Sequence, residues 1–245
     1  MKAIILAAGY ATRMHPLTEN QPKALLPLGG RTVIDFIIDH INSLPEVEEI
    51  IVVSNHKFYT HFEKWAKTVK SSVPVSVLND GSTSDADKIG SIGDIYFGVT
   101  QKNIEDDVLI IAGDNYLDYP LIEQYNYFKE KQNSVVCVLQ MDDVDKLKQF
   151  AVAILDADNK ITDLEEKPQS PQSDIGVFAT YFLTKESVNL LHSYVAEKQP
   201  MDPMGRLIEW LYKKVDFYAY VMNGNCYDLG TIDAYEDMKK KKGDK

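Results

Sequence analysis

The chain has 245 residues, 44% hydrophobic and 26% charged, proportions that are ordinary for a soluble globular protein and that one large α/β domain can fill. Its formal net charge of −11 argues against general nucleic-acid binding, which needs an extended basic surface. An anionic small-molecule substrate stays compatible with this charge if a local cluster of Lys and Arg, or a metal ion, offsets the overall field.

Cysteine usage and hydropathy place the chain in a reducing compartment. The two cysteines, Cys137 and Cys226, have neither metal-ligand nor Cys-x-x-Cys spacing, and Cys137 lies in an apolar run where a buried free thiol is expected. The opening run AIILAA is too short for a secretory signal, and no segment approaches the length of a membrane span. We therefore expect a cytoplasmic protein that uses neither a membrane nor a nucleic acid as partner.

The first part of the chain alternates between two kinds of segment. Nearly continuous apolar runs predict strands that are covered on both faces, at 2–8, 49–55, 73–79, 107–114 and 134–141. Apolar residues at helical spacing predict helices at 32–44, 57–70 and 119–132. This alternation predicts right-handed βαβ units and a doubly wound, mostly parallel, Rossmann-like sheet.

After about residue 142 the pattern changes. Residues 150–168 predict two short strands joined by a turn, and 175–184 a further strand, which together indicate a small additional sheet. Helices are predicted at 185–198 and 205–214, and a hairpin with its turn at NGN is predicted over 215–230. No linker or repeat separates this part, so one domain is expected over 1–237, followed by a solvated basic tail at 238–245.

The stretch LAAGYATRMHPLTENQPKALLP, residues 6–27, places two cations just after the first strand. Ligands of open α/β sheets bind outside the carboxyl ends of the strands, and the small residues from Ala7 to Gly9 would let the backbone approach a ligand closely. Arg13 and Lys23 are then a phosphate site, or alternatively two surface cations beside a glycine turn. Neither the P-loop pattern GxxxxGK[ST] nor the dinucleotide pattern GxGxxG occurs here.

Carboxylates follow two other predicted strands. Asp114 ends the run IIAGD, and Asp228 stands before a glycine turn in YDLGT. Each alone is compatible with a cap, but two of them beside Arg13 and Lys23 resemble a Mg²⁺–phosphate site, since Mg²⁺ is usually held by one or two carboxylates plus substrate phosphates. The segment DLEEKP adds Glu166 and Lys167, which read as a charged strand end or as groups for hydroxyls and a second phosphate.

The order of these motifs resembles the sugar-1-phosphate nucleotidylyltransferase family, and glucose-1-phosphate thymidylyltransferases in particular. The resemblance runs from Met1 to about Asp237 and implies a nucleotide-binding half at about 1–141 and an acceptor-binding half at about 142–237. It also implies a soluble enzyme that uses Mg²⁺, an NTP and a phosphorylated small molecule, and it leaves the oligomeric state open, a homo-oligomer included.

Site residues carried over from the family fall into three groups. The resemblance implies that the backbone of Leu6, Ala7, Ala8 and Gly9 holds the nucleobase and ribose, that Arg13 grips the triphosphate, and that Lys23 contacts phosphate oxygens near the reacting phosphorus. It implies Asp114 and Asp228 as Mg²⁺ ligands, with Asp114 counted among the catalytic residues. It implies Glu166, Lys167 and Tyr181 at the sugar phosphate, with Arg206 reaching the acceptor phosphate from a helix start.

Departures from the family pattern affect both pockets. Family glycines are replaced by Ala8, Ala11, Ala151 and Ala179, and the last two would shrink the acceptor pocket. Where thymidylyltransferases have a base-reading glutamine, this chain has Asn79 and Asp80, while Gly90 matches the glycine that approaches the base. An ionised carboxylate only accepts hydrogen bonds, so Asp80 would favour the amino group of cytosine or guanine. Alternatively Asp80 and Gly81 form a simple turn, and Ser91 and Asp94 form a capping box.

The sequence thus predicts a Mg²⁺-dependent nucleotidylyltransferase that converts an NTP and a sugar 1-phosphate to an NDP-sugar and pyrophosphate. The smaller acceptor pocket motivates an alternative, a cytidylyltransferase acting on a non-sugar phosphomonoester such as a phosphocholine-like amino alcohol. A third hypothesis is an inactive nucleotide-binding regulatory homologue, against which the joint retention of Arg13, Lys23, Asp114, Asp228 and Lys167 argues.

Overall fold

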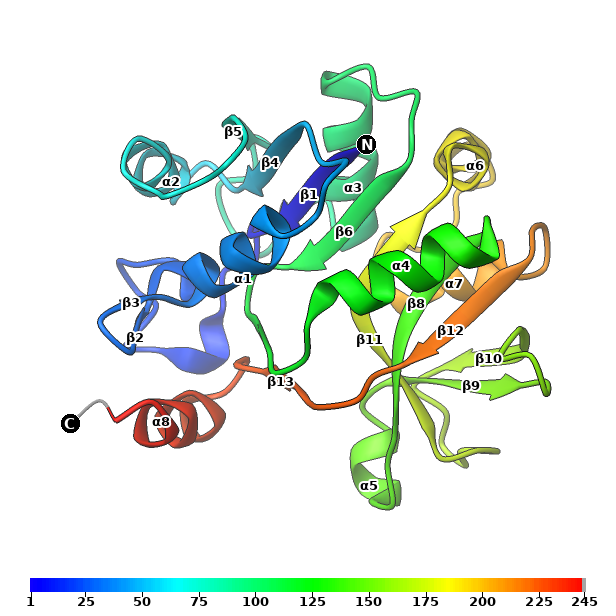
Figure 1. The fold of residues 1–245 in the computed structure, drawn as a ribbon. Helices are drawn as coiled ribbons and strands as arrows, with labels where there is room; N and C mark the ends of the chain where they lie inside the picture. Colours follow the sequence, from blue (N-terminus) through cyan, green and yellow to red (C-terminus); the bar gives the residue numbers. More distant parts are fainter. Residues whose placement is uncertain (244–245) are drawn as a thin grey trace.

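A nine-stranded sheet runs through the molecule, and it contains strands from both halves of the chain (Figure 1). The computed structural model describes residues 1–243. The neighbouring strands follow the order β10-β9-β11-β6-β1-β4-β5, and β11 also pairs with β8, which in turn pairs with β12. The first-half strands of this sheet are β1 (Lys2–Leu6), β4 (Glu49–Ser54), β5 (Val75–Asn79), β6 (Val108–Ala112) and β8 (Ser134–Gln140). Those from the second half are β9 (Ala151–Leu155), β10 (Ile161–Glu166), β11 (Ile175–Leu183) and β12 (Phe217–Val221).

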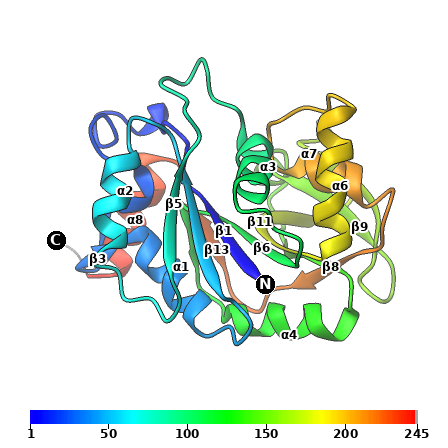
Figure 2. The same ribbon diagram turned by 90° about the horizontal axis from the view of Figure 1, so that it is seen from above.

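Helices cover both faces of this sheet, as Figure 2 shows. One face carries α1 (Val33–Asn42), α2 (Tyr59–Ala66) and α4 (Leu121–Lys131). The other face carries α3 (Ser91–Gln101), α6 (Lys185–Ala196) and α7 (Gly205–Leu211). Successive strand residues point to opposite faces, so Ile5 packs under the first layer and Ile4 under the second. Because both layers are apolar, the strands are continuous hydrophobic runs, as the sequence predicts.

The doubly wound expectation is confirmed in the first half, where β5, β4, β1 and β6 are mutually parallel. The second half joins through β11, which is antiparallel to β6 and to β8. The two strands predicted over 150–168 are β9 and β10, an antiparallel pair, and β11 also pairs with β9. The second half is therefore continuous with the first through one sheet.

The hairpin predicted over 215–230 is wrong. β12 pairs in parallel with β8, whereas β13 (Cys226–Asp228) pairs antiparallel with β7 (Asn115–Leu117). The NGN segment is thus a connection between two different sheets. It carries the chain from the edge of the large sheet back to the carboxyl end of β6.

Shorter elements complete the fold near the same end of the sheet. They are the 3₁₀ turns at Thr12–Met14 and Lys23–Leu25, the ribbon of β2 (Pro27–Leu28) and β3 (Arg31–Thr32), the one-turn α5 (Val144–Leu147) and the terminal α8 (Ile232–Lys241). The predicted basic tail starts inside α8 and is not simply solvated: Lys241 Nζ lies 4.4 Å from the ring centroid of Tyr227, and Lys242 Nζ lies 4.5 Å from that of Tyr116. Residues 244–245 of the predicted tail lie outside the described part. None of the helices within 1–243 has both the length and the apolar character needed to cross a bilayer.

Candidate active site

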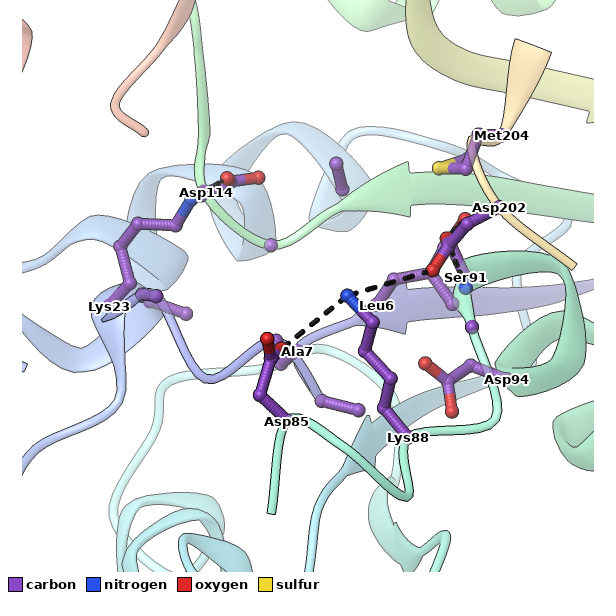
Figure 3. Close-up of a pocket in the computed structure, with 17 residues that line it drawn as sticks. Leu6, Ala7, Lys23, Asp85, Lys88, Ser91, Asp94, Asp114, Asp202 and Met204 are labelled. Carbon is purple, nitrogen blue, oxygen red and sulfur yellow. Dashed lines mark hydrogen bonds and ion pairs between the residues drawn. The ribbon is translucent and has the colours of Figure 1, made fainter. Parts of the chain in front are cut away.

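The turn after β1 forms one wall of a cavity of about 250 Å³ at the carboxyl end of the parallel strands. Its lining includes the predicted nucleotide-binding residues Leu6, Ala7, Ala8, Gly9 and Gly90, together with Lys23 and Asp114. Figure 3 shows Lys23 and Asp114 at one end of this cavity and the start of α3 at the other. We call it the first cavity.

Two side chains that the sequence analysis did not single out hold this turn in place. Asn55, fully buried after β4, donates from Nδ2 to the Ala8 carbonyl at 2.8 Å and accepts from the Phe58 amide at 2.9 Å. The hydroxyl of Tyr10 donates to the Ser82 carbonyl at 2.9 Å. The Tyr10 bond joins the turn to the loop after β5, and the Asn55 bonds join it to the segment after β4. An asparagine directly after a buried strand was the available signal for Asn55.

The predicted base-reading residues Asn79 and Asp80 do not line the first cavity. The Asp80 carboxylate accepts from both the amide and the hydroxyl of Ser82 at 2.7 Å, which makes a local turn. Asn79 likewise accepts from the Gly81 amide at 2.9 Å. The turn interpretation of this stretch therefore describes its geometry, and the carboxylates that reach the cavity come from elsewhere.

The predicted capping box of Ser91 and Asp94 is also wrong. Helix α3 begins at Gly90, whose φ of 84° and contact with the Met201 carbonyl admit no side chain, and no side chain caps it locally. Instead Asp202 accepts from the amide and hydroxyl of Ser91 at 2.7 and 2.5 Å. A segment more than 100 residues away thus caps α3, and the Asp94 side chain takes no part in the cap.

Asp94 is a buried carboxyl group in the wall of the first cavity. Its residue exposure is only 6%, and its Oδ1 has no hydrogen-bond partner within the described residues. Burial, followed by the negative charge of Asp80, a side-chain hydrogen bond with Asp80 and the charge of Asp202, raises the pKa of Asp94 to about 8. A strongly shifted carboxyl group with an unpartnered oxygen in a cavity is typical of a functional residue.

Lys23 and Asp114 form an ion pair at the opposite end. Burial opposes ionisation of Asp114, but the Lys23 ammonium outweighs it and, with Arg13, holds the pKa of Asp114 below its usual range. Arg13 is exposed, does not line the first cavity and makes no ion pair among residues 1–243. Its charge nevertheless reaches both Asp114 and Asp228, as does that of Lys23, so the four predicted phosphate-site groups share one region.

The β7–β13 ribbon brings Asp228 to this region. Asp228 is paired in register with Asn115, and the Leu229 amide donates to the Asp114 carbonyl at 3.1 Å. Desolvation by the surrounding protein, followed by the negative charge of Asp114, raises the pKa of Asp228. Two carboxylates that oppose each other's ionisation are stabilised by a cation placed between them.

The donor set at this point fits a Mg²⁺ ion that is held partly by substrate. No group of three or more His, Cys, Asp or Glu side chains among the described residues is placed to hold a metal. Asp114 and Asp228 supply carboxylate oxygens only, and Mg²⁺ typically takes one or two carboxylates, waters and substrate phosphates. These two residues would hold it and leave coordination positions for phosphate oxygens.

A second cavity, of about 210 Å³, lies beside Asp228 and contains most of the predicted acceptor residues. Ala151, Glu166, Lys167 and Tyr181 line it, whereas Arg206 does not. Arg206 pairs with Glu209 at 2.7 Å, although its charge, like that of Lys167, reaches Glu166. Burial raises the pKa of Glu166, which is only 7% exposed.

The second cavity is narrow because three chain segments meet there. A side chain at Gly205 would collide with the Glu166 carboxylate and would lie 2.9 Å from the Ala151 methyl group. Lys167, directly after β10, adopts a left-handed φ of 50°, an uncommon backbone conformation for a lysine. The alanines at 151 and 179 both line the cavity, as expected from the departures in sequence.

The two cavities adjoin along a shared wall. Met204 lines both of them near Asp202 (Figure 3), and at the other end Asp114 of the first cavity is followed directly by Asn115, which lines the second cavity with Asp228. Two molecules bound in the two cavities would therefore touch beside the carboxylate pair, with Lys23 on one side and Lys167 on the other. This arrangement suits the joining of two phosphorylated compounds.

Comparisons with known proteins agree with this geometry. A model of the nucleotidyl transferase family matches residues 2–245. The bifunctional protein GlmU of Methanococcus aeolicus is 29% identical over 235 residues, which are 94% of this chain and 51% of that protein. Glucose-1-phosphate adenylyltransferase of Clostridium novyi is 26% identical over 252 residues, 96% of this chain and 64% of that protein.

Solved structures share the fold. A crystal structure of UDP-glucose pyrophosphorylase complexed with UDP-glucose superimposes with a TM-score of 0.82 at 18% identity, covering 98% of this chain and 97% of that one. The chain spans about half the length of the GlmU proteins that it matches. With the family model covering nearly every residue, the chain belongs to the nucleotidyl transferase family.

Proposed function

We propose that this protein is a Mg²⁺-dependent nucleotidylyltransferase that joins an NTP to a sugar 1-phosphate and releases pyrophosphate. The closeness of Asp114, in the first cavity, to Asp228, in the second, carries the proposal, because it would place two phosphate groups side by side. The curated relatives named above, GlmU and glucose-1-phosphate adenylyltransferase, support the substrate class.

The proposed reaction is an in-line substitution at phosphorus. An oxygen of the acceptor phosphate attacks the α-phosphorus of the NTP, a new P–O bond forms, and the bond to the β-phosphate oxygen breaks. The leaving group departs as pyrophosphate with its bonding electrons. A phosphomonoester is mostly ionised at neutral pH, so no general base is needed, and alignment and charge neutralisation carry the catalysis.

Each charged group has a separate task in this scheme. Arg13 would bind the triphosphate with its planar fork, which can contact two oxygens at once. Lys23 would exchange its Asp114 partner for phosphate oxygens as the nucleotide binds, and Lys167 would hold the acceptor phosphate. Mg²⁺ would supply the remaining positive charge at the α-phosphate, held by Asp114 and Asp228.

One observation favours the alternative acceptor, a phosphorylated amino alcohol used by a cytidylyltransferase. Phe150 and Phe178 both line the second cavity, with ring centroids 4.8 Å apart, near the buried Glu166 carboxyl group. Aromatic rings beside a carboxylate suit a cationic group better than a hydroxylated ring. The test below therefore includes acceptors of both kinds.

The experiment is a pyrophosphate-release panel of the common NTPs against sugar 1-phosphates and phosphorylated amino alcohols, with and without Mg²⁺. We expect release that requires Mg²⁺ and one acceptor class, and we expect Arg13→Ala to lower it by about 10²-fold or more while thermal unfolding stays unchanged. Glu19→Ala, on the exposed part of the same loop, is the control and keeps the wild-type rate. Absence of release with every pair would instead support the inactive regulatory homologue.

A further inference from the structure

The end of the first cavity away from Lys23 holds a carboxyl oxygen without a partner, on a group that is otherwise linked to the Asp80 carboxyl group by a hydrogen bond. Asp94 is 6% exposed, its Oδ1 receives no hydrogen bond from any described residue, and the group lines the cavity. Burying a polar atom without a partner costs about 1–3 kcal/mol, so such atoms usually have a ligand. Asp94 does not cap α3, since Gly90 and Asp202 form the helix start, and its hydrogen bond to Asp80 leaves Oδ1 free for a ligand.

The position of Asp94 is that of a base-reading group. Lys23 and Asp114 lie at one end of the cavity, and Asp94, Lys88 and Asp202 lie at the other (Figure 3). If the triphosphate lies at the lysine end, as the proposed function requires, the nucleobase reaches the Asp94 end.

Charged groups at this end come from three chain segments. Lys88 reaches across the cavity between Asp85 at 3.4 Å and Asp202 at 4.0 Å (Figure 3). Asp80 lies close to Asp94, and its negative charge raises the pKa of Asp94. The base would therefore meet several hydrogen-bond acceptors and one cationic donor.

Among the common bases, guanine complements this set best. Its Watson–Crick edge carries two adjacent donor groups, N1–H and the N2 amino group, followed by the O6 acceptor. A carboxylate accepts two parallel hydrogen bonds, and a lysine ammonium donates only. Uracil and thymine offer one N–H between two carbonyl oxygens, which a carboxylate repels.

We propose that Asp94 is the specificity-determining residue for a guanine nucleotide, accepting from N1–H and the N2 amino group while Lys88 turns toward O6. This inference rests on the proposed function, because it takes the first cavity as the NTP site. It assigns the base preference to a residue in helix α3 instead of the loop that contains Asn79 and Asp80.

Binding in this way changes the protonation of Asp94. With its raised pKa the free group holds a proton at pH 7, and bidentate binding to guanine requires the carboxylate, so the proton leaves to solvent. The charges that face the group are Asp80 after β5, Lys88 and Asp85 in the following loop, and Asp202 before α7. GTP binding should therefore release about one proton at pH 7 and become tighter as pH rises from 6 to 8.

The test is equilibrium binding of GTP, ITP and UTP with Mg²⁺, measured by calorimetry in two buffers of different ionisation enthalpy. ITP lacks only the N2 amino group, so the GTP-to-ITP ratio isolates one hydrogen bond. For the wild type we expect GTP to bind about tenfold or more tightly than ITP, with proton release. Asp94→Asn replaces one acceptor by a donor and should bring the ratio close to one.

Glu130→Gln is the control, because it changes an exposed carboxyl group outside the cavity and leaves Asp94 and Lys88 in place; its GTP-to-ITP ratio should stay that of the wild type. A wild-type ratio near one, or a ratio that Asp94→Asn leaves unchanged, overturns the inference. If nucleotides bind and pyrophosphate is released without this preference, the inference alone fails. If no NTP binds to the wild type, the proposed function fails with it.

Discussion

Asp94 shows how a single buried acid ties stability to pH. The folded chain raises its pKa to about 8 from the ordinary value of 3.8, so between these values the unfolded chain has released a proton that the native chain keeps. The native state then binds more protons than the unfolded state, and the free energy of unfolding falls as pH rises through this window. Asp94 therefore lowers the free energy of unfolding by an amount that grows as the pH rises toward neutral.

This linkage predicts the behaviour of Asp94→Asn. The variant cannot ionise, so it should gain stability relative to the wild type as pH rises from 4 to 8, on the order of 2 kcal/mol across the window. Denaturant unfolding at several pH values measures the difference. The exposed Glu130→Gln change is the control and should stay within about 0.5 kcal/mol of the wild type throughout. A gain for Asp94→Asn that is the same at pH 4 and pH 8 would refute the linkage.

At the scale of single residues, some of the residues that line the cavities were predictable from the sequence and others were not. Motif order identified Lys23, Asp114, Asp228 and Glu166, which the fold gathers around two adjoining cavities. It could not tell which carboxylate after β5 lines the first cavity, because both a turn at Asp80 and a cap at Asp94 fit the local spacing. Asp202 decides the matter, since it caps α3 from a distant segment that no local pattern reveals.

At the scale of elements, the turn after β1 depends on a neighbour for its shape. Asn55 holds the Ala8 carbonyl on one side and the Phe58 amide on the other, so removing it leaves two buried polar groups unpaired. Asn55→Ala should lower the free energy of unfolding by about 2–4 kcal/mol and weaken NTP binding, because Ala8 belongs to the first cavity.

Asn42→Ala is the matched control for that prediction. Asn42 also bridges two segments through its amide, to Lys70 and Ser72, but these bonds are solvent-exposed. Its loss should cost about 1 kcal/mol or less and leave nucleotide binding unaltered. Chemical denaturation and NTP titration of both variants give the comparison, and equal losses for the two would show that Asn55 has no special role.

Strands and helices with long apolar patterns were predictable. A strand that is buried on both faces of a sheet needs a continuous run of hydrophobic residues, which is visible in the sequence. Pairing was less predictable. The NGN turn signal between β12 and β13 is local, but β12 finds its partner in β8 and β13 in β7, which are 80 to 110 residues away in the chain. The partner of each strand is settled by tertiary packing, which a turn dipeptide does not encode.

At the scale of the whole molecule, the fold brings opposite ends of the chain to one place. Lys23 follows the first strand, Asp114 follows β6, and Asp228 arrives through β13 near the carboxyl end of the chain. Their convergence places one lysine and two carboxylates together, the set that the proposed function uses to hold a cation and phosphate groups in a protein of net charge −11.

The most direct test of this convergence is anomalous scattering from a crystal soaked with Mn²⁺, an NTP and a sugar 1-phosphate, since Mn²⁺ binds the same oxygen ligands as Mg²⁺. Our account predicts one strong peak between the carboxylates of Asp114 and Asp228, with the triphosphate beside Lys23 and the second phosphate toward Lys167. A metal peak away from both aspartates, or a nucleotide bound outside the first cavity, would contradict it.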